Sequence, residues 1–350
     1  MLLKRFVWIA ALALPLGAIA CDGSSTSLQP EDDDRPGLET QLTSNPAPQR
    51  RPAISGPLIV WEDWRTGDSD IYLHDMTTGK TVPIAQGPGD QMRPAVSGSL
   101  VAWEDWGGGD ADVILYDVAT GETIPVAQGP GNQAFPNISG KRVVWQDDVG
   151  GDFDIVLHDL ESQVTQVLTG DGEQGHPQIS GTRVVWEDDR FGNAEIYVYD
   201  LVTERERRIT DQPAEQIDPD IEGDFVAWVD FRNGEENIYM FNLRTGKESQ
   251  VTFAQVLSSR QVTPDFHGES QRFPALSGPL LIWQDYVWNN HDVILFDINR
   301  GTKRRVTDVA QITRLHDEQA FPDISGRLIV WQDVRSGNSD IFLFDLDGGP

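Results

Sequence analysis

One pattern repeats seven times along this chain of 350 residues and constrains its fold more than any other feature. Each copy has a glutamine, a proline three residues later, a tryptophan nine residues after the proline, and an aspartate two residues after the tryptophan. The prolines are Pro52, Pro94, Pro136, Pro177, Pro219, Pro274 and Pro322. Successive copies lie 41 or 42 residues apart four times, then 55 and 48. Such self-similarity predicts an array of one repeated supersecondary unit.

Each copy contains four short strand patterns, and helical periodicity is absent throughout. In the first copy these segments are 51–55, 58–61, 71–75 and 81–84, separated by loops and tight turns. The second segment is apolar at successive positions, which is typical of a strand buried on both faces. Four short strands in a unit of about 42 residues indicate a propeller blade. We therefore predict an all-β, seven-bladed β-propeller of four-stranded blades over residues 38–350.

The two ends of this array are expected to complete one another. The seventh copy has only three strand patterns before Pro350. Ahead of the first copy, segment 38–43 (Leu-Glu-Thr-Gln-Leu-Thr) is similar to 247–252 (Lys-Glu-Ser-Gln-Val-Thr), a fourth strand elsewhere. We expect the N-terminal strand to complete the last blade, so that the ring closes without an open edge.

The start of the chain has the features of an export signal. Lys4 and Arg5 precede the apolar stretch 6–20, which ends in Ala-Ile-Ala before Cys21, the only cysteine. This order resembles the bacterial lipoprotein signal, which implies cleavage before Cys21 and attachment of lipid to its sulfur. An incidental thiol beside an ordinary cleavage site is the alternative. Residues 1–20 are thus predicted to be a signal peptide and 21–37 a flexible acidic tether. We expect an exported protein, lipid-anchored to a bacterial membrane on its periplasmic or cell-surface side.

The charge of the chain limits its partners. Asp and Glu number 56 against 27 Lys and Arg, a formal net charge of −29. Such a field repels nucleic acid and anionic lipid headgroups. We expect a monomer with no nucleic-acid partner, whose only contact with the membrane is the lipid anchor.

The motifs within the copies resemble those of a known family. Pro-x-Ile-Ser-Gly, Val-Val-Trp-Glu-Asp and Tyr-Asp-Leu are seen best in 177–203 and 322–345. They are similar to TolB-type (WD40-like) propeller repeats, and the resemblance covers 38–350. TolB has a separate α/β domain before its propeller, whereas only a short linker precedes the first strand here. The resemblance therefore implies a propeller-only relative, to which TolB's partners do not transfer.

Positions that are identical in all seven copies are expected to serve the fold. We predict that the tryptophans fill the space between blades. The aspartates should accept backbone N–H groups of the following hairpin, although a cation-binding ring of carboxylates is the alternative. The glutamines should bridge neighbouring blades.

Function is expected where the copies differ. The loops between second and third strands share one face with the insertions 254–270 and 309–318. That face carries Trp64, Trp106, Phe153, Phe191, Phe231, Tyr286 and Trp288. These rings form either a recognition surface or simple lids on the hairpin ends.

Histidines provide the one hint of chemistry. His267, His291 and His316 should lie in one sector of that face, either converging as a metal or general-base site or remaining separate loop tips. His176 aligns with a variable set of residues beside the central channel.

The leading functional prediction is a non-catalytic scaffold that binds an envelope protein or a glycan through the aromatic face. No nucleophile elbow, phosphate loop, zinc spacing or nucleotide fingerprint occurs. No catalytic residue, cofactor or metal is therefore predicted. One alternative is a polysaccharide-active, lyase-like enzyme with a histidine/metal site, and another is a purely structural envelope spacer.

Overall fold

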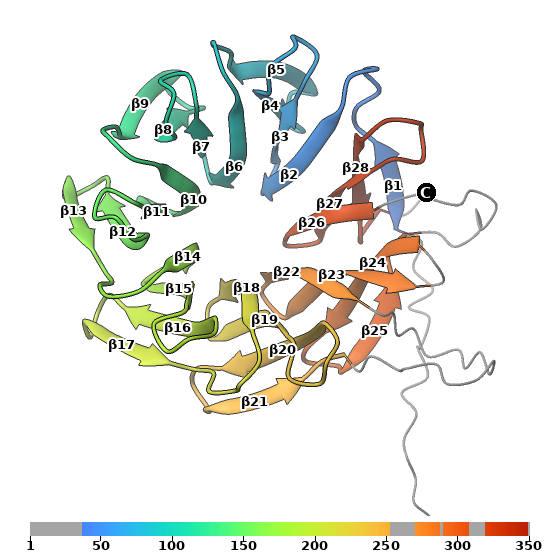
Figure 1. The fold of residues 1–350 in the computed structure, drawn as a ribbon. Helices are drawn as coiled ribbons and strands as arrows, with labels where there is room; N and C mark the ends of the chain where they lie inside the picture. The colour runs from blue at the N-terminus through green and yellow to red at the C-terminus, as the bar shows by residue number, and fades with distance from the viewer. Residues whose placement is uncertain (1–36, 253–269, 288–289, 308–318, 349–350) are drawn as a thin grey trace, which may run out of the picture.

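The computed structural model describes residues 37–252, 270–287, 290–307 and 319–348. Within them, seven antiparallel sheets of four strands stand in a ring around a central axis (Figure 1). The predicted seven-bladed propeller is therefore confirmed. In the part of the chain that the structure describes, no helix is long and apolar enough to cross a membrane.

The strands occupy four concentric positions, and each blade runs from the axis outward. The innermost strands are β2 (Gln49–Ser55), β6 (Gln91–Ser97), β10 (Gln133–Ser139), β14 (Gln174–Ser180), β18 (Gln216–Glu222), β22 (Gln271–Ser277) and β26 (Gln319–Ser325). The second strands are β3 (Leu58–Asp63), β7 (Leu100–Asp105), β11 (Arg142–Asp147), β15 (Arg183–Asp188), β19 (Phe225–Asp230), β23 (Leu280–Val287) and β27 (Leu328–Asp333). We number the blades 1 to 7 in this order.

The outer half of each blade follows the same scheme. The third strands are β4 (Asp70–Asp75), β8 (Asp112–Asp117), β12 (Asp154–Asp159), β16 (Glu195–Asp200), β20 (Asn237–Asn242), β24 (Asn290–Asp297) and β28 (Asp340–Asp345). The outermost strands are β5 (Lys80–Ala85), β9 (Glu122–Ala127), β13 (Val164–Val167), β17 (Arg205–Arg208), β21 (Lys247–Gln250), β25 (Thr302–Arg305) and, in blade 7, β1 (Leu38–Gln41).

The N-terminal strand closes the ring, as predicted. β1 pairs antiparallel with β28, with Leu38 opposite Asp345 and Gln41 opposite Phe342. Beyond the pairing, Arg335 Nη1 lies 2.6 Å from Glu39 Oε1. The first and last strands therefore share one sheet (Figure 1), and neither is left with a free edge at this seam.

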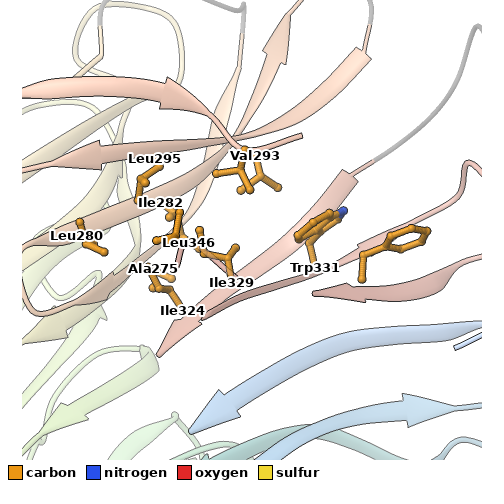
Figure 2. Packing of buried hydrophobic residues seen from close by; sticks show 11 residues of the cluster. Ala275, Leu280, Ile282, Val293, Leu295, Ile324, Ile329, Trp331 and Leu346 are labelled. Carbon is orange, nitrogen blue, oxygen red and sulfur yellow. The ribbon is translucent and has the colours of Figure 1, made fainter. Parts of the chain in front are cut away.

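The hydrophobic core is a set of layers between adjacent blades. The seven repeated tryptophans are at most 2% exposed. In one layer, Ile282 and Leu295 of blade 6 meet Ile329 and Trp331 of blade 7 (Figure 2). A large flat ring buries much apolar area in such a layer, so the predicted role of the tryptophans is confirmed.

The repeated polar residues behave partly as predicted. In six blades the aspartate accepts the predicted hairpin N–H, as in Asp230 Oδ1 from the Arg232 N–H at 2.9 Å. The glutamine prediction holds for the side chains of two blades: Gln271 Oε1 accepts from Thr252 of blade 5 at 3.0 Å, and Gln319 Oε1 accepts from Asn290 of blade 6 at 3.4 Å. In the other five blades the side chain donates to its own crossover loop, as Gln91 does to Gly89 O at 3.1 Å. There the backbone N–H makes the bridge instead, as from Gln91 to Ser69 O of blade 1 at 2.7 Å.

Candidate functional site

Each innermost strand carries a bulge at the residue before its proline. The register shifts there in all seven blades, and these residues have φ between 47° and 53°. A positive φ is costly for a non-glycine residue, and bulges commonly redirect a side chain. We call these residues the channel ring: Arg51, Arg93, Phe135, His176, Asp218, Phe273 and Phe321. They line an axial cavity of about 520 Å³.

A second set of residues matches the channel ring in charge. We call it the wall set, the residue after each repeated tryptophan: Glu62, Glu104, Gln146, Glu187, Val229, Gln284 and Gln332. Where the ring residue of a blade is Arg or His, the wall residue is Glu; where it is Phe, the wall residue is Gln. The blade with Asp218 has Val229. Ring and wall residues therefore vary together across the seven blades.

The wall residues also link neighbouring blades. Glu62 Oε1 accepts the Arg93 N–H at 2.8 Å, and Gln146 Oε1 accepts the His176 N–H at 3.1 Å. Because glutamine performs this link as well as glutamate, the fold does not require the negative charge. The three glutamates instead neutralise the basic ring residue of their own blade, as Glu104 does for Arg93 at 2.9 Å.

Three residues of blades 4 and 5 form a cluster of metal-ligating groups. His176 Nδ1 lies 2.8 Å from Glu187 Oε1, which also accepts the Asp218 N–H at 2.7 Å. One ligand atom from each of the three side chains lies within 4.8 Å of the other two. Among the described residues, this is the only such grouping of His, Cys, Asp or Glu. We call it the channel triad.

The surroundings of the channel triad favour a cation. Burial, and then the charge of Glu187, raise the pKa of Asp218 to about 6. Burial alone would lower the pKa of His176, but its hydrogen bond to Glu187 and that residue's charge raise it. Two carboxylates and one imidazole form a donor set that suits Mn²⁺ or Zn²⁺. The wall residue of the Asp218 blade is Val229, which has no charge to neutralise the carboxylate. A divalent ion held between the three side chains would supply that positive charge, so the residues present fit such an ion.

The channel triad lies where two cavities meet. A second cavity, of about 460 Å³, is lined by Phe153, Glu187 and Glu215 among others. It shares Phe135 and His176 with the axial cavity. A ligand entering either cavity would therefore reach the imidazole of His176.

Two further carboxylates, of Asp220 and Asp323, line the axial cavity. Asp220 Oδ2 accepts the Leu276 N–H at 2.7 Å, and Asp323 Oδ2 accepts the Ile54 N–H at 2.8 Å, so each links its blade to the next. Burial raises the pKa of Asp220 to about 7, with a contribution from Asp323, and burial raises that of Asp323 to about 6. Asn137 accepts the corresponding N–H of Ile179 in blade 4, at 3.3 Å.

These carboxylates predict a pH-dependent effect of one substitution. A carboxyl pKa raised on folding favours the folded state below the unfolded value of 3.8, and this contribution is lost as the pH rises toward 7. Asp220→Asn should therefore raise the free energy of unfolding by about 1–2 kcal/mol at pH 8 and by much less at pH 5. Urea unfolding at both pH values measures it. An equal effect at both would exclude titration as the cause.

The residues of the predicted aromatic face differ in their exposure and in their contacts. Phe191 is 67% exposed, whereas Phe231 packs on the cluster between blades 5 and 6. Trp64 lies beside the Arg50 guanidinium, and Trp106 Nε1 donates to Glu104 Oε2 at 3.2 Å. Phe153 lines the second cavity.

Of the predicted group of His267, His291 and His316, only His291 lies among the described residues. His291 contacts Tyr286, with ring centres 4.9 Å apart. His267, Trp288 and His316 lie outside the described residues. The repeat pattern places His176 beside the channel, but its grouping with Glu187 and Asp218 was not predicted. The joint variation of ring and wall residues, visible in the sequence, is the signal that could have found it.

Comparisons with known proteins agree on the fold. No protein-family model and no curated protein matches the sequence. An oligogalacturonate lyase structure from Vibrio parahaemolyticus is 13% identical and covers 90% of this chain and 95% of its own, with a TM-score of 0.64. An oligogalacturonate lyase in complex with manganese is 14% identical, covers 90% and 94%, and has a TM-score of 0.62. TolB from Acinetobacter baumannii is 17% identical and covers 67% and 58%, with a TM-score of 0.49. TolB-like propellers are thus among the neighbours, as expected.

The leading functional prediction is contradicted by these comparisons. Two structures that resemble this chain over nine-tenths of its length are lyases, whereas a non-catalytic scaffold was predicted. The prediction failed because it took the lack of a linear catalytic motif as lack of chemistry. Here the reactive groups come from different strands and blades, far apart in the sequence. The alternative, a lyase-like enzyme with a histidine/metal site, agrees better with the findings.

Proposed function

We propose that this chain is a polysaccharide-active, lyase-like enzyme that works at the channel triad. The observation that carries the proposal is the grouping of His176, Glu187 and Asp218 within 4.8 Å at the meeting of two cavities. One of the similar oligogalacturonate lyases is in complex with manganese, which is consistent with a metal at such a site.

Elimination on an acidic sugar requires three events. The proton beside the sugar carboxylate leaves, the C–O bond of the glycosidic link breaks on the neighbouring carbon, and the departing oxygen takes up a proton. A bound divalent ion would supply a Lewis acid for the sugar carboxylate.

The three side chains of the channel triad would hold this ion and are therefore not available to carry protons. Glu187 Oε1 fixes the imidazole of His176 through Nδ1 and leaves Nε2 to bind the ion. By drawing electrons from the sugar carboxylate, a bound ion would make the neighbouring proton easier to remove.

The second cavity gives the substrate a place to lie. Phe153, one of the predicted aromatic residues, lines it and offers an apolar face against which a sugar ring can pack. A polysaccharide that reached the axis through this cavity would bring one of its sugars to the channel triad, and the neighbouring sugars would stay in the second cavity. We also propose that Cys21 carries the lipid that holds the enzyme at a membrane.

A metal titration tests the proposal. We expect Mn²⁺ to bind the purified protein at one site, and Glu187→Gln to lower its affinity by about 100-fold or more, because a ligand is lost. Gln146 already fills the equivalent wall position, so the substitution should leave the fold intact. Isothermal titration calorimetry measures the affinity, and ultraviolet absorbance of unsaturated products measures activity on acidic polysaccharides.

Glu104→Gln is the matched control, since it makes the same change at a wall position outside the triad. It should leave Mn²⁺ affinity within about twofold. Equal Mn²⁺ binding by wild type and Glu187→Gln would contradict the proposed site.

A further inference from the structure

The channel ring also contains a pair of arginines that the channel triad does not use. Arg51 and Arg93 stand on adjacent blades and line the axial cavity. The Arg51 guanidinium lies 4.3 Å from the centre of the Phe321 ring, and that of Arg93 lies 4.1 Å from Phe135. Each guanidinium is thus held against an aromatic face, which fixes its plane.

Most hydrogen-bond donors of this pair remain free. Among the described residues, the Arg51 guanidinium donates no hydrogen bond, and its nearest carboxylate oxygen, on Glu62, is 3.9 Å away. Arg93 donates to Glu104 through Nη1 alone, and its Nε is buried without a partner in the described part of the chain. Two fixed guanidinium groups with free donors beside a cavity suit an oxyanion.

The fold does not account for these arginines. The same bulge forms in blades 3, 6 and 7 around phenylalanine and in blade 5 around aspartate. Burial lowers the pKa of Arg51, and the charge of Arg93 adds to this effect while Glu62 opposes it. Two positively charged residues are therefore kept on adjacent blades at positions where phenylalanine would allow the same backbone bulge.

We propose that Arg51 and Arg93 form an oxyanion-binding pair that selects ligands carrying a sugar carboxylate. The pair faces the triad closely enough that Arg51 interacts electrostatically with Asp218, and Arg93 with His176. Phe135, Phe273 and Phe321 also line the axial cavity and supply apolar surface for a sugar ring, which a bare inorganic anion would not need. The choice of a sugar acid rests on the proposed function, whereas binding of an oxyanion does not.

The test uses the full-length protein freed of metal with EDTA, so that it does not depend on the channel triad. Isothermal titration calorimetry at low ionic strength compares D-galacturonate, D-galactose and inorganic phosphate. We expect galacturonate to bind at least about tenfold more tightly than either other probe, because only it combines a carboxylate with a sugar ring.

The propeller itself supplies the matched variants. Arg51→Phe with Glu62→Gln, and Arg93→Phe with Glu104→Gln, install the ring and wall pairing of blades 3, 6 and 7. Combining both pairs should weaken galacturonate binding by about tenfold or more while Mn²⁺ binding at the triad stays within about twofold. If this protein unfolds, Arg51→Gln with Arg93→Gln replaces it, with the same expectation for galacturonate binding.

Either of two results would overturn the inference: galactose binding as tightly as galacturonate, or variants that bind galacturonate like the wild type. Phosphate binding as tightly as galacturonate would refute a sugar acid as the ligand. Absent Mn²⁺ binding with intact galacturonate selectivity would instead refute the proposed function alone.

Discussion

Replacing Asp230 with alanine is expected to lower the free energy of unfolding by about 2–4 kcal/mol, because it leaves the buried Trp228 indole N–H unpaired and the half-buried Arg232 with Glu248 as its only carboxylate partner. Asp230 is fully buried, and its carboxylate accepts Trp228 Nε1 at 2.9 Å and Arg232 Nε at 2.9 Å. Arg232 in turn lies 4.2 Å from the Tyr239 ring centre, and Tyr239 stacks on Trp228. One carboxylate thus holds an arginine, two aromatic rings and a hairpin together.

Blade 2 offers the matched control for this substitution. Asp105 accepts the Gly107 N–H at 2.9 Å, but no arginine follows it, and Trp103 Nε1 has no partner in the described structure. Asp105→Ala should therefore cost only about 1–2 kcal/mol. Urea unfolding of both variants gives the comparison. Equal losses would show that neither the Arg232 nor the Trp228 pairing contributes to the effect.

Removing the N-terminal strand is expected to have a comparable effect. A chain that starts at Asn45 lacks β1, which leaves the edge of β28 unpaired and Arg335 without Glu39. We expect a loss of about 3–5 kcal/mol and a tendency to associate through the exposed edge. A chain that starts at Gly37 retains β1 and should unfold like the full-length protein.

A peptide with the sequence of residues 37–44 separates loss of the strand from a general effect of truncation. Added to the chain that starts at Asn45, it should restore the melting temperature in a concentration-dependent way. If the shortened chain were as stable as the control without the peptide, ring closure by β1 would not stabilise the fold.

The fold could be predicted from the sequence because all seven blades repeat the same pattern of residues. A repeated Gln, Pro, Trp and Asp at fixed spacing marks seven equivalent units, and the likeness of 38–43 to 247–252 identifies the closing strand. The fact that a residue is identical in all seven copies did not reveal which of its atoms form hydrogen bonds. The glutamines were expected to bridge neighbouring blades, and the side chains of Gln271 and Gln319 do so, whereas in the other five blades the backbone makes the bridge and the amide turns back to its own loop.

The site could be predicted only in part, because its residues meet through interactions between strands and blades. His176 and Glu187 are 11 residues apart, on β14 and β15, and Glu187 and Asp218 are 31 residues apart, in different blades. They are brought together by the bulge before each proline and by the hydrogen bond that the backbone N–H of a ring residue donates to the wall side chain of the preceding blade. Both features occur in every blade. Comparing the seven copies at the channel-ring and wall positions would therefore have revealed that the charges of these two residues vary together. The expected group of His267, His291 and His316 lies mostly outside the described residues and stays a prediction.

Diffraction data collected near the manganese absorption edge, from crystals grown with Mn²⁺, would show directly whether the channel triad binds a metal. We expect one anomalous peak bounded by His176, Glu187 and Asp218, and its loss in crystals of Glu187→Gln. A map without a peak there, or one whose only peaks lie on the surface carboxylates, would contradict a metal centre on the axis of the propeller.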